Sequence, residues 1–118
     1  MPTSDAYTSA GEAKVIDLMD TVTWYAGVGI GTTAAAKTDT ALGNTTGCPA
    51  RVATTDTQPT EDKLQMVALF SFTSALAITE LGIFDTASNG TLLQRHVFDP
   101  INTVNGDSIQ FTTLHEQA

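Results

Sequence analysis

The chain has 118 residues, 42% of them hydrophobic, and its 13 acidic and five basic side chains give a formal net charge of −8. This length and composition predict one folded domain with a hydrophobic core, and the negative charge argues against binding to nucleic acids or anionic membranes. The single cysteine, Cys48, rules out an internal disulfide, and the sequence shows neither a signal peptide nor an apolar run of about 20 residues, so we expect a protein made in a cytoplasm.

The N-terminal part of the chain is expected to form a short polar arm, residues 1–8, followed by one helix and one strand. Ser9 and Glu12 have the spacing of a capping box, and apolar residues recur at helical intervals after them, which predicts a helix near residues 10–19. The β-branched and aromatic residues 21–28 predict a strand. Glycine, threonine and alanine remove any periodicity from the segment that follows, which predicts a long loop.

The middle of the chain is predicted to hold two strands. Residues 49–55 predict a short strand that stops at the turn-rich residues 56–60, and residues 63–73 have the clearest alternating pattern in the sequence. Alternate side chains of this second strand are apolar, so we expect one of its faces in the core. Val67 and Leu69 are apolar on the opposite face, which predicts contact with another surface, either a second sheet or a neighbouring subunit.

Two further segments complete the predicted fold. Residues 77–98 consist of two apolar, β-branched runs around Asn89 and Gly90, a pair that adopts positive φ at low cost, and they predict a β-hairpin in which this pair has a structural role. Alternation in residues 108–114 predicts a last strand. About six strands joined mainly by short turns indicate a mainly β fold, an antiparallel sandwich or barrel with one short N-terminal helix, in which residues 9–118 form a single domain.

Two glycine-containing motifs resemble nucleotide-binding sequences, but both have a simpler interpretation. Residues 31–38 nearly match a phosphate-binding P-loop, yet Ala36 occupies the position where that loop requires glycine, and no following helix is expected. The glycines of residues 27–31 have the spacing of a dinucleotide fingerprint without the surrounding βαβ unit. We therefore expect no cofactor, and interpret these segments as a surface loop that contacts a neighbour and as glycines at a strand end.

The side chains that most often perform catalysis or bind metals are isolated in this sequence. His96 and His115 have no cysteine, histidine or aspartate partner at the spacing of metal ligands. Cys48 is expected to be a packed thiol, because the sequence places no base or positive charge beside it. A nucleophile-elbow sequence is also missing, so no catalytic or metal site is predicted and the chain is not expected to be an enzyme.

Two residues are structural candidates for different reasons. Glu80 interrupts an apolar strand, where an unpaired buried carboxylate would be strongly destabilising, so it either faces solvent or is paired. We expect a structural role for Glu80, with Arg51 or Arg95 as its partner. Trp24 either anchors an interface or belongs to the core, and the core is the favoured interpretation.

Four blocks of sequence follow one another along the chain: WYAGVGIGTTAAAKTDTALGN (residues 24–44), RVA (51–53), AITELGIFDTASNGTLLQRHVF (77–98) and INTVNGDSIQFT (101–112). Their order and spacing resemble a widespread family of small structural proteins encoded by tailed bacteriophages. Members of that family look like GxGTTAxxxxDTAL, then R, then ITExGLFDAxxGGTLLARxxF, then xVxxGDSLxFT. The resemblance extends over nearly the whole chain.

The resemblance implies a non-enzymatic virion structural protein, most specifically a capsid decoration or cement protein that binds the outer surface of the phage head and stabilises it. Its partner would be the major capsid protein, and such proteins often form homo-trimers. Because the chain ends at Ala118, shortly after its last predicted strand, we expect a compact subunit without the shaft of a tail fibre. The alternative within the same resemblance is a tail, collar or fibre-attachment component, with a tail or neck protein as partner.

Contact residues are expected in the long loop and the N-terminal arm, because loops and termini reach a partner while strands hold them in place. A surface with few charged residues, 15% of the chain, suits contact with other subunits. A carbohydrate-binding module, with Tyr7, Trp24 and Tyr25 as stacking residues, is an alternative of a different class. The residues expected to contact the capsid or another subunit are Thr3, Tyr7, Ile30, Thr32, Thr33, Lys37 and Thr38.

Overall fold

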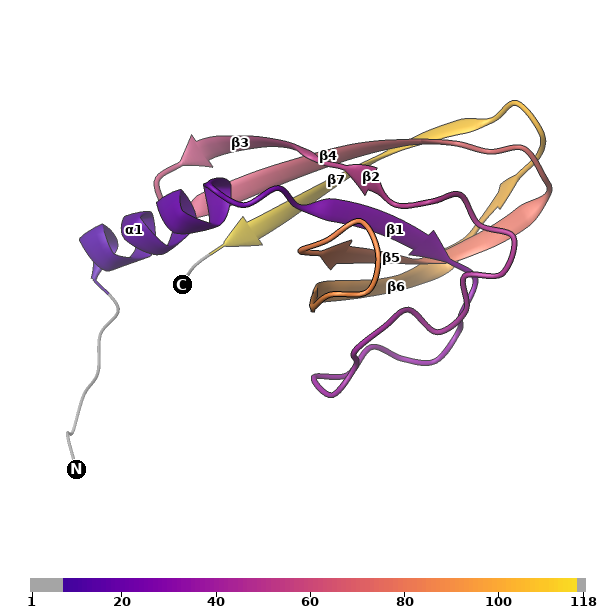
Figure 1. Cartoon of the computed structure of the whole chain (residues 1–118), viewed down its shortest axis with the longest axis horizontal. Helices are drawn as coiled ribbons and strands as arrows, with labels where there is room; N and C mark the ends of the chain where they lie inside the picture. The colour runs from indigo at the N-terminus through magenta and orange to yellow at the C-terminus, as the bar shows by residue number, and fades with distance from the viewer. Residues whose placement is uncertain (1–7, 117–118) are drawn as a thin grey trace.

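The computed structural model of the chain describes residues 8–116 and shows two antiparallel sheets packed face to face, with a helix at one end (Figure 1). One sheet has the strand order β2-β1-β5-β6 and the other β3-β4-β7. The predicted mainly β sandwich with one short helix is confirmed, with one strand more than expected. The elements are α1 (Ser9–Asp20), β1 (Tyr25–Gly29), β2 (Val52–Ala53), β3 (Thr55–Thr60), β4 (Lys63–Ser71), β5 (Leu76–Phe84), β6 (Leu92–Thr103) and β7 (Ser108–Glu116).

Helix α1 lies where the sequence predicts it, but its N-cap differs. The side-chain oxygen of Thr8 accepts a hydrogen bond from the N–H of Gly11 at 3.0 Å, so the cap is Thr8 and not Ser9. Glu12 lies in the first turn, where the positive end of the helix dipole favours a negative charge. The helix packs against β3 and β4, and the side chain of Ile16 is fully buried at this contact.

Strands β5 and β6 form the predicted hairpin. Asn89 and Gly90 both have positive φ, 56° and 73°, which is the conformation that an Asn-Gly pair adopts most readily. The strands pair antiparallel from Phe84 opposite Leu92 onward. β6 is longer than predicted, because it continues through Pro100. Proline is tolerated there because β6 is an outer strand, and its free side has no backbone hydrogen bonds to another strand that a proline would interrupt.

Strand β4 alternates between the core and the outside of the sandwich, as predicted. Leu64 and Phe70 are fully buried on its inner face, whereas Leu69 on the outer face is 59% exposed. The second sheet packs against the inner face only. The sequence predicts that the face of Val67 and Leu69 contacts either a second sheet or a neighbouring molecule. In the described part of the chain no second sheet covers this face. Contact with a neighbouring molecule stays a prediction.

Several boundaries differ from the sequence prediction. The strand predicted over residues 21–28 is β1, which begins only at Tyr25. Residues 56–60, predicted to be a turn, belong to β3, and the strand predicted over residues 49–55 is reduced to the two residues of β2. The pairing of β3 with β4 is irregular between Thr57 and Thr60, around Pro59. Polar residues and a proline are tolerated in β3 because it is an outer strand. The same composition that is typical of a turn therefore occurs here in an exposed edge strand.

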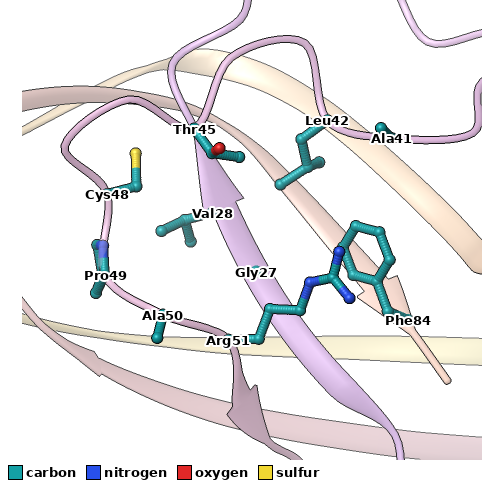
Figure 2. Close-up of a pocket in the computed structure, with 10 residues that line it drawn as sticks. All are labelled: Gly27, Val28, Ala41, Leu42, Thr45, Cys48, Pro49, Ala50, Arg51 and Phe84. Atoms are coloured by element: carbon teal, nitrogen blue, oxygen red, sulfur yellow. The ribbon is translucent and has the colours of Figure 1, made fainter. Parts of the chain in front are cut away.

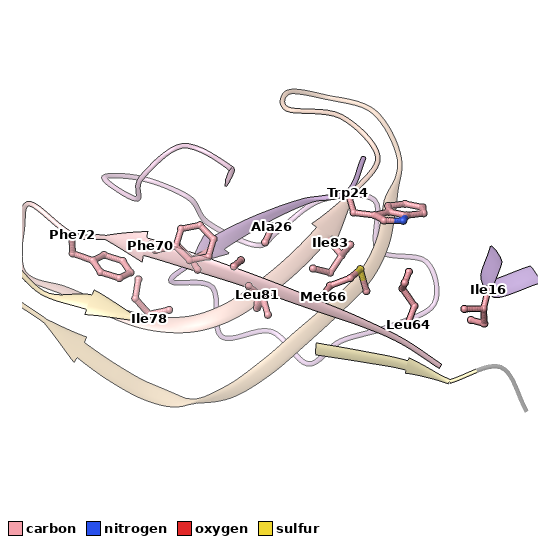
Figure 3. Packing of buried hydrophobic residues seen from close by; sticks show 12 residues of the cluster. Ile16, Trp24, Ala26, Leu64, Met66, Phe70, Phe72, Ile78, Leu81 and Ile83 are labelled. Carbon is pink, nitrogen blue, oxygen red and sulfur yellow. The ribbon is translucent and has the colours of Figure 1, made fainter. Parts of the chain in front are cut away.

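The hydrophobic core lies between the two sheets (Figure 3). The ring of Phe111 contacts those of Phe70 and Phe98, with centroids 5.9 and 5.8 Å apart. Near α1, Trp24 is only 8% exposed, and its indole N–H donates to the carbonyl oxygen of Met19 at 2.8 Å. Trp24 is therefore a core residue whose one polar atom is satisfied.

Candidate functional site

The outer face of strands β1 and β5 is covered by residues 30–51, which we call the anchored loop. Gly27 and Gly82 lie beneath it and leave room for Leu42: a Cβ atom at position 82 would lie 2.8 Å from a methyl carbon of Leu42. The loop thus acts as a partial third layer. This explains why β5 is buried on both faces over residues 78–84.

The carboxylate of Glu80 lies at the centre of the contact between β5 and the anchored loop, and its side chain is fully buried. Its Oε2 atom accepts the backbone N–H groups of Gly31 at 2.7 Å and Asn44 at 3.0 Å, and Oε1 accepts the N–H of Gly43 at 2.8 Å. Oε1 also contacts Nε and Nη2 of Arg95, each at 2.9 Å. Of the two partners considered from the sequence, Arg95 is the one that pairs with Glu80.

Arg95 extends the network from the buried carboxylate to the tip of the loop. Its Nη1 atom lies 3.0 Å from the carboxylate of Asp39, and its Nη2 atom donates to the carbonyl oxygen of Thr33 at 2.8 Å. Asp39 in turn accepts the N–H of Ala36 at 2.8 Å. The network therefore holds the loop near its start, at its tip and at Gly43 and Asn44, through hydrogen bonds to charged groups, which are the strong ones.

These contacts determine the charge of the two carboxylates. Burial raises the pKa of Glu80, but the three backbone N–H donors and the guanidinium of Arg95 outweigh burial, and the pKa lies below its ordinary value. The N–H of Ala36, followed by Arg95, holds the pKa of Asp39 below its ordinary value as well. Both groups are ionised at neutral pH, so the network has two carboxylates around one guanidinium.

The glycines of the G-x-G spacing have a structural explanation in this network. A Cβ atom at Gly31 would lie 2.5 Å from Oε2 of Glu80 and 2.8 Å from the Cα of Gly43, and Gly29 is crowded by the same carboxylate. Gly29 is the last residue of β1. The interpretation as glycines at a strand end thus agrees with the structure, and the close approach of the Glu80 carboxylate is the reason for glycine.

The tip of the anchored loop carries most of the residues predicted to make contacts. Thr32, Thr33, Lys37 and Thr38 are all exposed. Ile30 differs from them, because it is half-buried and packs against the core. Two other predicted contact residues, Thr3 and Tyr7, and nearly all of the N-terminal arm lie outside the described residues.

The P-loop resemblance of residues 31–38 finds no counterpart in the geometry. The segment is irregular and leads into further loop, whereas a P-loop passes directly into a helix whose N-terminus receives the phosphate. The amides that a P-loop would offer to phosphate are also engaged here: the N–H of Gly31 donates to Glu80 and that of Ala36 to Asp39. The loop binds carboxylates of its own chain.

A cavity of about 340 Å³ lies between the anchored loop and β1 (Figure 2). Cys48 lies at its edge, and burial, followed by the charge of Glu80, raises the pKa of its thiol. A raised pKa keeps the thiol in its unreactive protonated form, consistent with a packed cysteine. The residues around the cavity are Gly27, Val28, Ala41, Leu42, Thr45, Cys48, Pro49, Ala50, Arg51 and Phe84.

Arg51, the other candidate partner of Glu80, is used at the hairpin turn. Its guanidinium carbon lies over the ring of Phe84, 3.4 Å from the centroid, as Figure 2 shows. Its Nη1 atom donates to the carbonyl oxygens of Thr86 at 3.0 Å and Asn89 at 2.8 Å. Arg51, the last residue of the anchored loop, therefore ties the start of β2 to the β5–β6 hairpin through a cation–π contact and two hydrogen bonds.

The two histidines are linked through one glutamine. The amide nitrogen of Gln94 lies 2.7 Å from Nδ1 of His115, and its amide oxygen lies 3.1 Å from Nε2 of His96. Within residues 8–116, no three side chains of the metal-binding types converge on one point. No helix in this described part of the chain is long and apolar enough to cross a membrane.

The sequence indicates only part of this network. Asp39 and the backbone donors of the anchored loop were not singled out, because a bond between a side chain and a distant amide leaves no pattern of residue types. One usable signal was present: a glutamate inside an apolar strand together with the closely spaced Gly29 and Gly31. A buried carboxylate needs donors, and glycines allow a backbone to approach it closely.

The exposed part of the candidate site has the chemistry of a recognition surface. It offers threonine hydroxyls, alanine methyl groups and the ammonium of Lys37, while the charged groups beneath it bind one another. No protein-family model and no curated protein matches the sequence of this chain.

Proposed function

We propose that this chain is a non-enzymatic virion structural protein of a tailed bacteriophage, most specifically a decoration protein that binds the outer surface of the phage head and stabilises it. Its partner in this proposal is the major capsid protein. The phage role derives from the resemblance of the four sequence blocks. The observation that supports the binding surface is an exposed loop fixed from beneath by the buried pair of Glu80 and Arg95.

Fixing the loop in advance favours binding. Association normally loses roughly 0.5–1.5 kcal/mol for each flexible side chain that it orders, and ordering loop backbone adds to this loss. In the anchored loop, hydrogen bonds already hold the backbone at Gly31, Thr33, Gly43 and Asn44. A contact with a rigid tip keeps more of its interaction energy, and copies joined in one oligomer would add their contacts through effective concentration.

The charge of the tip also suits this role. Lys37 is its basic side chain on a chain of net charge −8. The other basic residue near it, Arg95, is occupied by Glu80 and Asp39. An acidic group on the partner surface would therefore be attracted at the tip and repelled by most of the remaining molecule, which orients the encounter.

Binding to phage heads tests this proposal. Purified protein is mixed with heads of the encoding phage assembled without it, and bound protein is measured after sedimentation of the heads. We expect saturable binding of the unchanged chain and at least about tenfold weaker binding of Lys37→Glu, because the substitution reverses the charge at the tip.

Lys14→Glu is the matched control, since it makes the same charge change at an exposed position of α1. It should bind like the unchanged chain. Equal weakening by both variants would assign the effect to net charge and contradict the proposed surface. Protein found on tails in a few copies, and not on heads, would contradict the decoration role in favour of the tail, collar or fibre-attachment alternative.

The carbohydrate-binding alternative loses one of its three stacking residues. Trp24 is buried and its indole N–H is used within the chain, so its ring is not available to a sugar. Tyr25 is half-buried in β1. Both of these rings are thus at least half-buried, which disfavours stacking on a sugar.

A further inference from the structure

The four outer strands of the two sheets differ in how their free edges are protected. Outer strands expose unpaired backbone groups, and proteins usually prevent unwanted pairing there with short strands, prolines or irregularities. In the described part of the chain, β2 has only two residues, β3 contains Pro59 and an irregularity, and β6 contains Pro100 and two irregularities. Three of the four edges thus carry such a device.

Strand β7 carries none of them. Its nine residues pair with β4 in an unbroken register, from Ser71 opposite Ser108 to Lys63 opposite Glu116. It contains neither proline nor glycine, and between positions 108 and 114 it has no charged side chain. A long, regular edge without charged side chains from Ser108 to Leu114, in a chain that protects its other edges, indicates a strand that pairs with something.

The surface around β7 is also unusually free of charge for a chain of net charge −8. The outward positions of β4 and β7, between 65 and 71 and between 108 and 114, hold only uncharged side chains, and Leu69 and Leu114 are 59% and 50% exposed. Beside β7, a mainly apolar groove of about 590 Å³ opens toward β6, with Phe98 and Phe111 in its wall and, among the described residues, Asp99 as the one carboxylate that lines it.

We infer that this edge pairs with the same edge of a second copy of the chain, antiparallel and centred on Thr112. A second copy also carries a charge of −8, so two copies approach each other most favourably where neither presents a charged group. Between Ser108 and Leu114 the edge of β7 meets this condition. Pairing would join the two β3-β4-β7 sheets into one continuous sheet, with the groove beside β7 covered by the second copy.

A register centred on Thr112 is compatible with a second copy as the occupant. A two-fold axis at Thr112 places Gln110 opposite Leu114 of the second copy and Ile109 opposite its His115. Between positions 109 and 115, His115 is the only titratable side chain, and this register does not place the two histidines opposite each other. No like charges meet across the axis, which is the condition that cross-strand pairs require.

This contact is a property of the chain in solution and does not depend on the capsid role. It has two-fold symmetry, so it predicts a dimer, whereas the phage resemblance implies a trimer. A closed two-fold contact also leaves no further β7 edge free for continued pairing.

The test measures the mass of the protein in solution and reverses charge at the axis. We expect the unchanged chain to approach twice its mass of 12.4 kDa as its concentration rises in sedimentation equilibrium. Thr112→Lys and Thr112→Glu place like charges directly opposite each other, and each should weaken dimerisation at least about tenfold. An equimolar mixture of the two variants should restore dimers, because lysine then faces glutamate.

Thr57→Lys is the control, because Thr57 is also exposed and lies on β3, the protected edge of the same sheet. It should dimerise like the unchanged chain. Circular dichroism verifies that every variant is folded, as expected for exposed positions. A chain that is monomeric at all concentrations, a trimer, or a dimer unaffected by the changes at Thr112 would overturn the inference.

Discussion

At the scale of single residues, the unusual feature is a fully buried glutamate in the middle of a strand. Burying a carboxylate without partners is costly, and Glu80 avoids this cost with backbone N–H groups from Gly31, Gly43 and Asn44 and the guanidinium of Arg95. A strand residue thereby organises the backbone of a loop that is distant in sequence. Few side chains other than a carboxylate could accept all of these donors at once.

The contribution of Glu80 to stability should depend on pH in a defined direction. Because its pKa is lower in the folded chain than in the unfolded chain, the unfolded chain binds more protons below the ordinary glutamate pKa of about 4.3. The stabilisation is therefore complete above that pH and is lost as the pH falls through the lowered folded value. Urea unfolding should show Glu80→Gln less stable by about 3–5 kcal/mol at pH 7, with the difference shrinking in acid.

Glu61→Gln is the matched control, since it makes the same chemical change at an exposed carboxylate. Its free energy of unfolding should stay within about 0.5 kcal/mol of the unchanged chain at pH 7. If Glu80→Gln proved equally harmless, or if its deficit were the same at every pH, the network would not hold the loop through an ionised carboxylate.

Gly31→Ala should be markedly more destabilising than Gly27→Ala. At position 31 the added Cβ would meet the Glu80 carboxylate at 2.5 Å and the backbone of Gly43 at 2.8 Å, and neither can move without breaking the network. At position 27 the nearest atom, at 3.2 Å, is Cγ of the flexible Arg51 side chain. Thermal unfolding should give a loss of about 1–3 kcal/mol for Gly31→Ala and less for Gly27→Ala; the reverse order would contradict the close approach.

At the scale of elements, the sequence predicts best where a local pattern determines the structure. The hairpin of β5 and β6 follows from Asn89 and Gly90, and β4 follows from apolar residues at every second position from Leu64 to Phe70. Both signals depend on neighbouring residues alone. For the same reason α1 was predicted to within a residue or two of its observed bounds.

Elements that depend on distant partners were predicted less well. β3 looks like a turn by composition and becomes a strand because β4 offers its edge. The anchored loop looks unstructured and becomes ordered because Glu80 and Arg95 bind its backbone. Nothing in the local sequence of Asp39 indicates that it binds a guanidinium 56 positions further along the chain. Tertiary context decided each of these cases.

At the scale of the whole molecule, the two outer faces of the sandwich differ. The outer face of β1 and β5 is covered by the anchored loop, which presents a rigid tip with Lys37 at its surface. The outer face of β4 and β7 is bare, holds only uncharged side chains over residues 65–71 and 108–114, and is bordered by an unprotected edge. In the proposed account the first face contacts the phage head and the edge of β7 joins two copies, so neither contact obstructs the other.

An electron cryomicroscopy reconstruction of intact virions tests the central claim, that the anchored loop attaches this chain to the outside of a phage head. The account predicts density for the subunit on the outer surface of the head, with residues 32–38 facing the major capsid protein. Density for the subunit confined to the tail or neck, or a head-bound subunit with this loop turned toward solvent, would contradict it.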